Sequence, residues 1–197
     1  MKFILGTKQK MTQLFDEEGK VHPVTVIKTG DMVAVQAKTK IKDGYDAVQI
    51  GFGTKSAKRI NQAQKGHMKD GNYLHLKEIK DTQANVGEKI ESTLEAGDVV
   101  SVSALSKAKG FQGVVKRHGF AGGPRSHGQK HSEREPGSIG AGGYQRVFKG
   151  RKMAGRTGGD RVTVKNLVIM HVDKDAQEVY VRGAIPGRTG TLVEIRG

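Results

Sequence analysis

Lysine, arginine and glycine are concentrated between Ala104 and Arg161, where 13 Lys and Arg residues stand against 3 Asp and Glu residues. The same stretch holds half of the chain's 28 glycines and most of its formal net charge of +14. Lys and Arg side chains neutralise phosphates, and glycine lets a backbone approach another surface closely because it has no side chain. This combination indicates a peptide that lies between RNA helices.

Two motifs inside this stretch combine these residue types at short spacing, Pro136-Gly-Ser-Ile-Gly140 and Val147-Phe-Lys-Gly-Arg-Lys-Met-Ala-Gly155. The second motif places basic residues beside Phe148 and Met153, which are apolar and have nothing local to cover them. Such a mixture suits phosphate contact together with packing into an RNA junction. We predict close backbone approach to RNA at six glycines, Gly110, Gly113, Gly137, Gly140, Gly150 and Gly155.

The side chains predicted to contact RNA are basic, apart from three histidines, one serine, Phe148 and Met153. Neutral imidazole both donates a hydrogen bond and stacks on bases, which favours RNA contact by the histidines. The predicted residues are Lys8, Lys10, Lys107, Lys109, Lys116, Arg117, His118, Arg125, His127, Lys130, His131, Arg134, Ser138, Arg146, Phe148, Lys149, Arg151, Lys152, Met153, Arg156 and Arg161.

Metal and catalytic chemistry is disfavoured. His118, His127 and His131 lie near Glu133 and Glu135, but their glycine-rich surroundings offer no rigid scaffold for a metal. The segment Gly51-Phe-Gly-Thr-Lys-Ser56 departs from the spacing of a phosphate-binding loop, because Thr54 separates glycine from lysine. The chain has neither a Gly-x-Ser-x-Gly motif nor a cysteine. We therefore expect no cofactor, no metal, no small-molecule substrate and no enzyme activity.

The composition points to a polyanionic partner. The 197 residues are 35% hydrophobic and 5% aromatic, with a pI near 10.0, so part of the chain must find contacts outside a dry core. No stretch approaches the ~20 apolar residues of a membrane span, and Met1–Leu5 is too short for a secretory signal. These features predict a cytoplasmic protein without a membrane partner.

Outside the basic stretch, the pattern is typical of short β-strands. Val21–Lys28 and Asp31–Lys38 alternate β-forming and polar residues, and the Thr29-Gly30 connection predicts a hairpin between them. Lys10–Phe15 precedes a turn at Asp16–Gly19. Further strands are predicted at Ala47–Phe52, Asp98–Ser103, Val162–Val172, Glu178–Arg182 and Thr191–Ile195. A closed or half-closed antiparallel β-barrel hides the edges of such strands.

The predicted fold class is therefore mainly β, with few short helices and a long basic, glycine-rich extension. Residues 1–103 and 161–197 form the barrel domain, with a polar insertion at about 54–97, and residues 104–160 form the extension. Helical turns are predicted near Arg59–Gln64 and Phe111–Arg117, and a strand or turn at Tyr73–Ile79. Gly119–Gly159 shows no period of either kind.

Several motifs resemble one known family, the universal ribosomal protein L-three of the large subunit in its bacterial form. The resemblance runs nearly from end to end, although Gln9-Lys10 departs from the family's usual Val-Gly. It is carried by Lys8–Phe15, Pro23–Ile27, Gly44–Gln49, Gly66-His67, Ser106–Gly113, Lys116-Arg117, Ser126–Gly128, Pro136–Gly140, Val147–Gly155, Arg161–Val164 and Gly183–Gly187.

This resemblance implies a barrel of the kind found in elongation factors and reductases, with an extension that reaches toward the peptidyl transferase centre. It also implies direct binding to the 23S-type RNA of the large subunit, neighbouring ribosomal proteins as partners, early entry into subunit assembly, and a cytoplasmic location in the ribosome. In that family the protein supports the shape of the catalytic RNA and does no chemistry itself.

One departure lies near the predicted tip of the extension. Ala141–Arg146 has six residues where the bacterial pattern usually has seven, which predicts a shorter tip. Some relatives carry a methylated glutamine here, but Gly143 stands at the nearest matching position and Gln145 is out of register. The modification is therefore not carried over to this chain.

Two other function classes use a basic segment in the same way. An RNA-modifying or RNA-processing enzyme uses such a segment to hold its RNA substrate. An assembly factor or translation regulator uses it to bind RNA without remaining in the ribosome. A structural component stays with large subunits through a high-salt wash, whereas an enzyme or a factor leaves them.

We predict that binding to an RNA fragment weakens steeply as salt rises. Each neutralised phosphate contributes roughly 0.7 to 0.9 to the log–log slope, so six contacts give a slope of about −4 to −5. Filter binding across a salt series measures this slope. An affinity that stays constant from low to moderate salt would contradict phosphate contact by the basic stretch.

Overall fold

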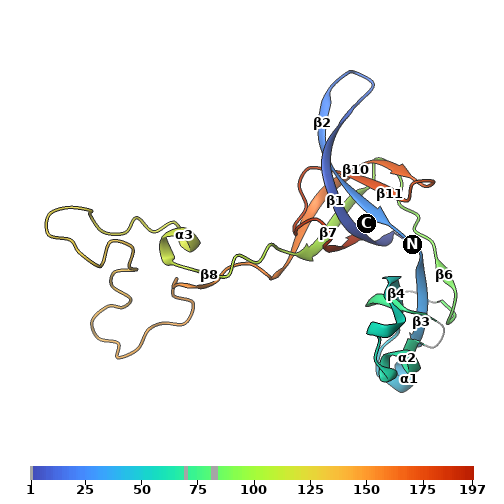
Figure 1. Cartoon of the computed structure of the whole chain (residues 1–197), viewed down its shortest axis with the longest axis horizontal. Helices are drawn as coiled ribbons and strands as arrows, with labels where there is room; N and C mark the ends of the chain where they lie inside the picture. The colour runs from blue at the N-terminus through green and yellow to red at the C-terminus, as the bar shows by residue number, and fades with distance from the viewer. Residues whose placement is uncertain (1, 69–70, 81–83) are drawn as a thin grey trace. The chain divides into compact units, whose positions relative to one another are not determined.

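The computed structural model describes residues 2–68, 71–80 and 84–197 and is mainly β, with antiparallel sheets and few short helices (Figure 1). This confirms the predicted class at that level. The chain divides into two compact units. The first comprises residues 1–105 and 161–197, and the second comprises residues 106–160.

A closed ring of six antiparallel strands forms the larger part of the first unit. Each strand is hydrogen-bonded to two neighbours, and β2 closes the ring because it pairs with β11 on one side and with β1 on the other. Closure leaves no free edge around the ring. In ring order, the strands are β1 (Phe3–Phe15), β12 (Leu192–Arg196), β7 (Val99–Leu105), β10 (Arg161–Asp173), β11 (Glu178–Arg182) and β2 (Val21–Thr29).

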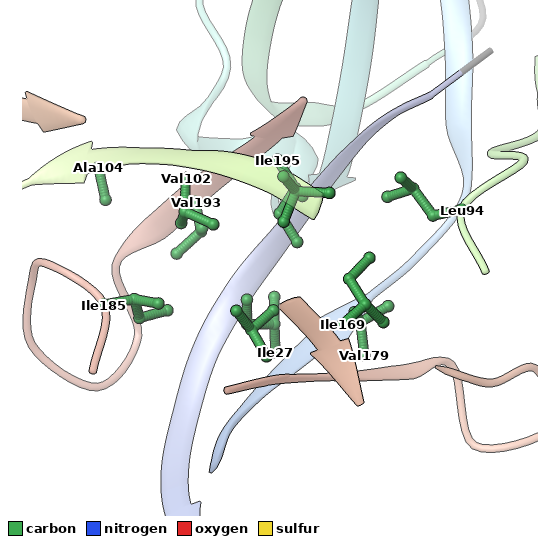
Figure 2. Close-up of a cluster of buried hydrophobic side chains, with 11 residues drawn as sticks. Ile27, Leu94, Val102, Ala104, Ile169, Val179, Ile185, Val193 and Ile195 are labelled. Atoms are coloured by element: carbon green, nitrogen blue, oxygen red, sulfur yellow. The ribbon is translucent and has the colours of Figure 1, made fainter. Parts of the chain in front are cut away.

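The interior of the ring is filled by branched aliphatic side chains (Figure 2). Ile27, Ile169 and Ile195 are fully buried there, together with Val102 and Val193. They come from strands far apart in the sequence, so the core exists only when the ring is assembled. Successive strand residues point to opposite faces, which explains why short alternating segments suffice to build it.

A second antiparallel sheet lies in the same unit, in the order β5, β4, β3 and β6. Met32, Ile50 and Phe52 of this sheet share a buried cluster with Phe3 and Leu5 of β1. The strands are β3 (Met32–Lys38), β4 (Ala47–Thr54), β5 (Tyr73–Lys80) and β6 (Lys89–Ile90), and the helices beside them are α1 (Lys40–Asp43), the 3-10 helix η1 (Ala57–Arg59) and α2 (Gln62–Met68).

The predicted hairpin between Val21–Lys28 and Asp31–Lys38 is wrong. The first segment is β2, which pairs with β1 and β11, and the second is β3, which pairs with β4 and β6. Over Val24–Lys28, both edges of β2 are already occupied by β1 and β11, so β3 cannot pair with it there. The turn at Asp16–Gly19 instead connects a hairpin of β1 and β2.

The stretch predicted as a polar insertion contributes regular structure to the second sheet. Its predicted strand or turn at Tyr73–Ile79 is confirmed as β5, and the helical turns predicted near Arg59–Gln64 are η1 and α2. The periodicity there is weak because β5 is only partly buried, with one residue, Ile79, in the core.

The second unit contains little regular structure. A two-stranded sheet joins β8 (Phe111–Gln112) to β9 (Gly155–Arg156), and α3 (Val114–His118) follows β8 directly. The helical turn predicted over Phe111–Arg117 therefore begins three residues later than expected. Residues 119–154, all of them described, contain no helix or strand.

We expect Ile195→Ala to lower the free energy of unfolding by about 2–5 kcal/mol, because it opens a cavity at the centre of the ring. Ile41→Ala is a matched control, since that side chain is 97% exposed on α1. The control is expected to change stability by less than about 0.5 kcal/mol. Urea unfolding followed by circular dichroism measures both; equal effects would mean that the ring core is not formed as described.

Candidate nucleic-acid interface

The second unit begins with a narrow antiparallel stem, in which the residues before β8 pair with the residues after β9. Ser106 N donates to Asp160 O at 2.9 Å, Lys109 N donates to Thr157 O at 2.8 Å, and Thr157 N donates to Gly110 O at 2.9 Å. The backbone pairs with itself along the stem, so its side chains are free to point outward. Lys107, Lys109 and Arg156 are exposed there.

Helix α3 is attached to the returning chain by its basic side chains. Val114 is buried, while Arg117 Nη1 and His118 Nε2 both donate to Met153 O, at 2.8 and 3.0 Å. The helix ends at Gly119, which adopts a left-handed conformation. Arg117 and His118, both predicted to contact RNA, therefore also hold the loop in place.

The loop that follows α3 is closed at Glu133, through both its backbone carbonyl and its carboxylate. Gly123 N donates to Glu133 O at 2.8 Å, and Arg125 Nε forms an ion pair with Glu133 Oε1 at 2.7 Å. Glu133 was one of the two acidic side chains weighed for a metal site. In the structure, its carboxylate instead forms an ion pair with Arg125.

The two glycine-containing motifs are brought together at the tip of this unit. Arg151 Nη2 donates to Ser138 O at 2.7 Å, which joins residues that are 13 positions apart. The rings of Tyr144 and Phe148 pack edge to face with centroids 4.9 Å apart, and both side chains are exposed. Ile139 and Val147 are exposed as well. The tip thus presents apolar and aromatic surface among cations.

Most cations of this unit have no partner among the described residues. Residues 106–160, all of which are described, contain twelve Lys and Arg residues, and only Arg117, Arg125 and Arg151 use their side chains in a hydrogen bond or ion pair. The nine others are Lys107, Lys109, Lys116, Lys130, Arg134, Arg146, Lys149, Lys152 and Arg156. Unpaired, exposed cations at this density are suited to phosphate binding.

Three of the predicted RNA-binding residues lie in the other unit. Lys8 Nζ donates to Ile185 O at 2.8 Å and to Gly187 O at 3.0 Å, and Arg161 forms an ion pair with Glu194. Lys10 is exposed on β1. The structure gives Lys8 and Arg161 internal contacts, which their residue types alone did not reveal.

A second group of free cations lies on the first unit and was not predicted as a site. Lys58 and Arg59 in η1 and Lys65 in α2 are exposed, and Lys55 precedes them. None of the four has a side-chain partner in the described part of the chain. The signal was present in the sequence, because no acidic residue occurs between Asp46 and Asp70.

This basic segment is held on the second sheet by two apolar anchors. Ile60 and Met68 are buried in a small cluster with Val35, while the residues between them are exposed. Asn61 Oδ1 accepts a hydrogen bond from Gln64 N at 2.7 Å at the start of α2. The anchors fix the segment, and its cations face solvent.

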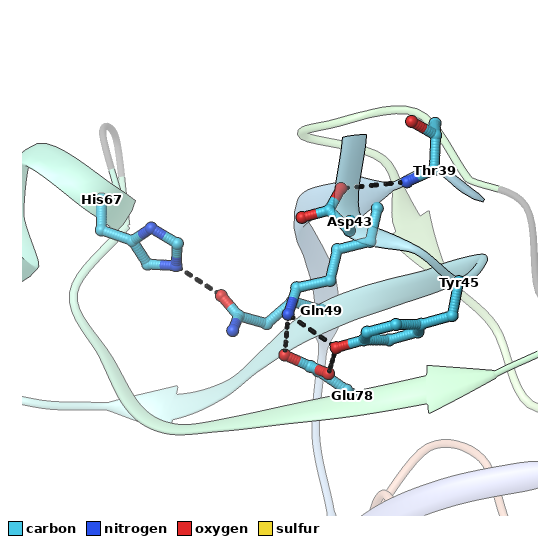
Figure 3. Close-up of polar contacts among 7 residues, drawn as sticks. Thr39, Asp43, Tyr45, Gln49, His67 and Glu78 are labelled. Carbon is cyan, nitrogen blue, oxygen red and sulfur yellow. Dashed lines mark hydrogen bonds and ion pairs between the residues drawn. The ribbon is translucent and has the colours of Figure 1, made fainter. Parts of the chain in front are cut away.

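A polar network beside α1 is internally satisfied (Figure 3). Lys38 Nζ donates to Glu78 Oε1 at 2.6 Å and to Tyr45 Oη at 2.9 Å, and Tyr45 Oη donates to Glu78 Oε2 at 2.9 Å. The hydrogen bond from Lys38 lowers the pKa of Glu78 and, reciprocally, raises the pKa of Lys38. Neither group exchanges protons near neutral pH, so the network fits a structural role.

Two features of the described residues bear on other functions. They contain no group of three or more His, Cys, Asp or Glu side chains arranged to hold a metal ion. Among the described helices, none has the length and apolar character needed to cross a membrane.

Comparison with known proteins decides the family. A profile described as ribosomal protein L3 matches residues 71–182, more than half of the chain. The chain belongs to the ribosomal protein L3 family. The large ribosomal subunit protein uL3 of Finegoldia magna is 47% identical over 204 residues, covering 100% of this chain and 97% of that protein.

Two further L3 relatives match the chain over nearly its whole length. The protein uL3 of Desulfitobacterium hafniense is 46% identical, covering 99% of this chain and 95% of its own length. The protein uL3c of Guillardia theta is 43% identical, with 98% of each chain covered. The resemblance found in the sequence motifs is thereby confirmed.

Two neighbouring glycines at the tip allow a test of close approach to RNA. Gly140 was predicted to lie close to RNA and Gly142 was not, yet both have ordinary φ angles and open space where a Cβ would stand. We expect Gly140→Val to weaken RNA binding by about tenfold, equivalent to roughly 1.4 kcal/mol of overpacking, with unchanged melting of the free protein. Gly142→Val should bind like the parent.

Filter binding and thermal melting measure both variants. Gly150→Val is a less direct test, because Gly150 has a φ of 82° and a β-branched residue is strained there even without RNA. Equal affinity of the Gly140→Val protein and its parent would contradict close approach at this glycine.

Proposed function

We propose that this protein is a structural component of the large ribosomal subunit that binds 23S-type ribosomal RNA directly. Residues 106–160 are the principal RNA-binding segment. The observation that carries this proposal is the set of nine exposed cations that have no partner in the described part of the chain. They lie on the self-paired stem, on α3, in the loop after α3 and at the tip, where apolar side chains are also exposed. The segment has almost no hydrophobic core of its own to stabilise it. An RNA surface supplies phosphates for the cations and a surface on which the apolar side chains pack.

The ring of six strands supports a finer assignment, a β-barrel of the elongation-factor and reductase kind. Residues 1–103 and 161–197 then form the barrel domain, and residues 104–160 form the extension that supports the RNA of the peptidyl transferase centre. Family membership supports early entry into assembly, a place in the cytoplasmic ribosome and neighbouring ribosomal proteins as partners. The RNA contacts are those predicted above, with Lys55, Lys58, Arg59 and Lys65 added as a second contact.

The enzyme alternative is not favoured by the family or by the polar groups. The networks described above are satisfied within the chain, and the named relatives are ribosomal subunit proteins. A structural component stays in the ribosomal subunit, whereas an assembly factor or translation regulator leaves it. Sedimentation therefore provides the test of function.

After a high-salt wash, we expect this protein to sediment with large subunits in an amount equal to that of other subunit proteins. The Lys149→Gln/Lys152→Gln variant should leave the subunit at lower salt, because two unpaired cations at the tip are lost. Lys165→Gln/Lys174→Gln is the matched control, since it removes two exposed cations from β10 and the turn after it. Release of the parent protein in the first wash would contradict the proposal.

A further inference from the structure

The β1–β2 hairpin extends beyond the rest of the ring (Figure 1). β12 pairs with β1 only over Phe3–Thr7, and β11 pairs with β2 only over Val24–Lys28. Beyond these limits, Gln13–Phe15 pair with Val21–Pro23, and Met11 and Thr12 pair with Thr25 and Val24. None of Met11–Phe15 and Val21–Pro23 is in register with a third described strand. In the described part of the chain, the outer backbone edges of Met11–Phe15 and of Val21 and His22 are consequently open, whereas Pro23 O accepts a hydrogen bond from Gly183 N at 2.8 Å. Folded proteins usually cover or pair such edges.

One face of this outer hairpin is apolar and exposed. Phe15 lies opposite Val21 and Gln13 lies opposite Pro23, so these residues share a face with Met11. Met11 is 51% exposed, Phe15 65% and Val21 48%, and the residues around Gln13 line a shallow hollow. The opposite face carries Leu14 and His22, of which His22 is buried. Single exposed apolar side chains are common, but a group on one face marks an interaction surface.

The tip of the hairpin is acidic, and its turn is held by hydrogen bonds to Asp16. Asp16 Oδ1 accepts hydrogen bonds from Lys20 N at 2.8 Å and Glu18 N at 3.1 Å, and Asp16 Oδ2 accepts one from His22 Nε2 at 2.9 Å. The hydrogen bond from His22, with those from the backbone, lowers the pKa of Asp16. Glu17 and Glu18 are exposed, and their side chains have no partner in the described chain.

The hairpin tip is negatively charged, whereas the protein as a whole is positively charged. Between Met11 and Val21 there are three acidic residues and one lysine, in a chain whose net charge is +14. Carboxylates repel the phosphates of RNA and attract lysine and arginine side chains. Asp16 is used to shape the turn, whereas Glu17 and Glu18 remain available to a partner.

We infer that the outer β1–β2 hairpin is a docking surface for a lysine- and arginine-rich segment of a neighbouring ribosomal protein. Apolar side chains of that segment pack on Met11, Phe15 and Val21, and its cations pair with Glu17 and Glu18. The inference rests on the proposed function in one respect, since the partner is a protein of the same subunit. It adds a protein-binding site at the tip of this hairpin, where carboxylates disfavour RNA.

The test uses the full-length protein with the photoreactive amino acid benzoylphenylalanine in place of Phe15, incorporated into large subunits in cells. Washed subunits are irradiated, and the adducts are identified by mass spectrometry. We expect an adduct with one ribosomal protein, at a peptide rich in lysine and arginine. The same probe in place of Ile41, on α1, is expected not to give that adduct.

Charge reversal supplies the matched comparison. Glu17→Lys/Glu18→Lys is expected to lower the yield of the protein adduct by about tenfold, because two exposed ion pairs are replaced by repulsion. Glu91→Lys/Glu95→Lys makes the same change of charge at exposed positions elsewhere in the unit and should leave the yield unchanged. Melting of the free proteins checks that all variants fold.

Each other outcome overturns the inference. An adduct with ribosomal RNA, an adduct with a second copy of this chain, no adduct, or a yield unaffected by Glu17→Lys/Glu18→Lys would each do so. Failure of the proposed function is recognised separately, because the parent protein itself would then be absent from washed large subunits. If the parent is present and the probe fails, only the docking surface is wrong.

Discussion

The pairing of β7 with β10 is the interaction on which the rest of this structure depends. It places Leu105 opposite Arg161, so the 106–160 segment leaves and re-enters the first unit at adjacent strand positions. The ladder then continues into the second unit, where Ser106 N donates to Asp160 O. The same two strands contribute Val100, Val102 and Ile169 to the buried cluster of the ring. A single ladder thus helps to close a core and holds together the two ends of a segment that has almost no core.

The two units of the chain also differ in how their charges are neutralised. The ring is stabilised by buried aliphatic side chains, and its buried carboxylate, Glu194, is paired with Lys77 at 2.9 Å and with Arg161. In the second unit, cations greatly outnumber carboxylates, so most of them cannot be neutralised within the chain. The hairpin tip has the opposite sign. A ribonucleoprotein component that meets both RNA and protein is expected to carry these two kinds of surface at separate places.

Particular elements show how far the sequence predicts this fold. Strand β11 and the turn at Asp16–Gly19 follow directly from local patterns, because alternation and turn residues are read over a few positions. The pairing of β2 with β3 was predicted from the same kind of pattern and is wrong, since local alternation does not identify a strand's neighbour. Likewise, the basic types of Lys8 and Arg161 suggested RNA contact, while their carbonyl and carboxylate partners lie far away in the sequence.

The sequence by itself determined the family, the β-rich character, and the position of the cationic, glycine-rich segment, because these depend on composition and on short motifs. Only the tertiary structure decided which strands close the ring, that β3–β6 form a separate sheet, and which cations remain unpaired. It also showed that Met11, Phe15 and Val21 lie exposed on one face, next to an acidic turn. The physical reason is that burial and ion pairing depend on contacts between residues distant in the chain, and these contacts exist only once the ring has closed.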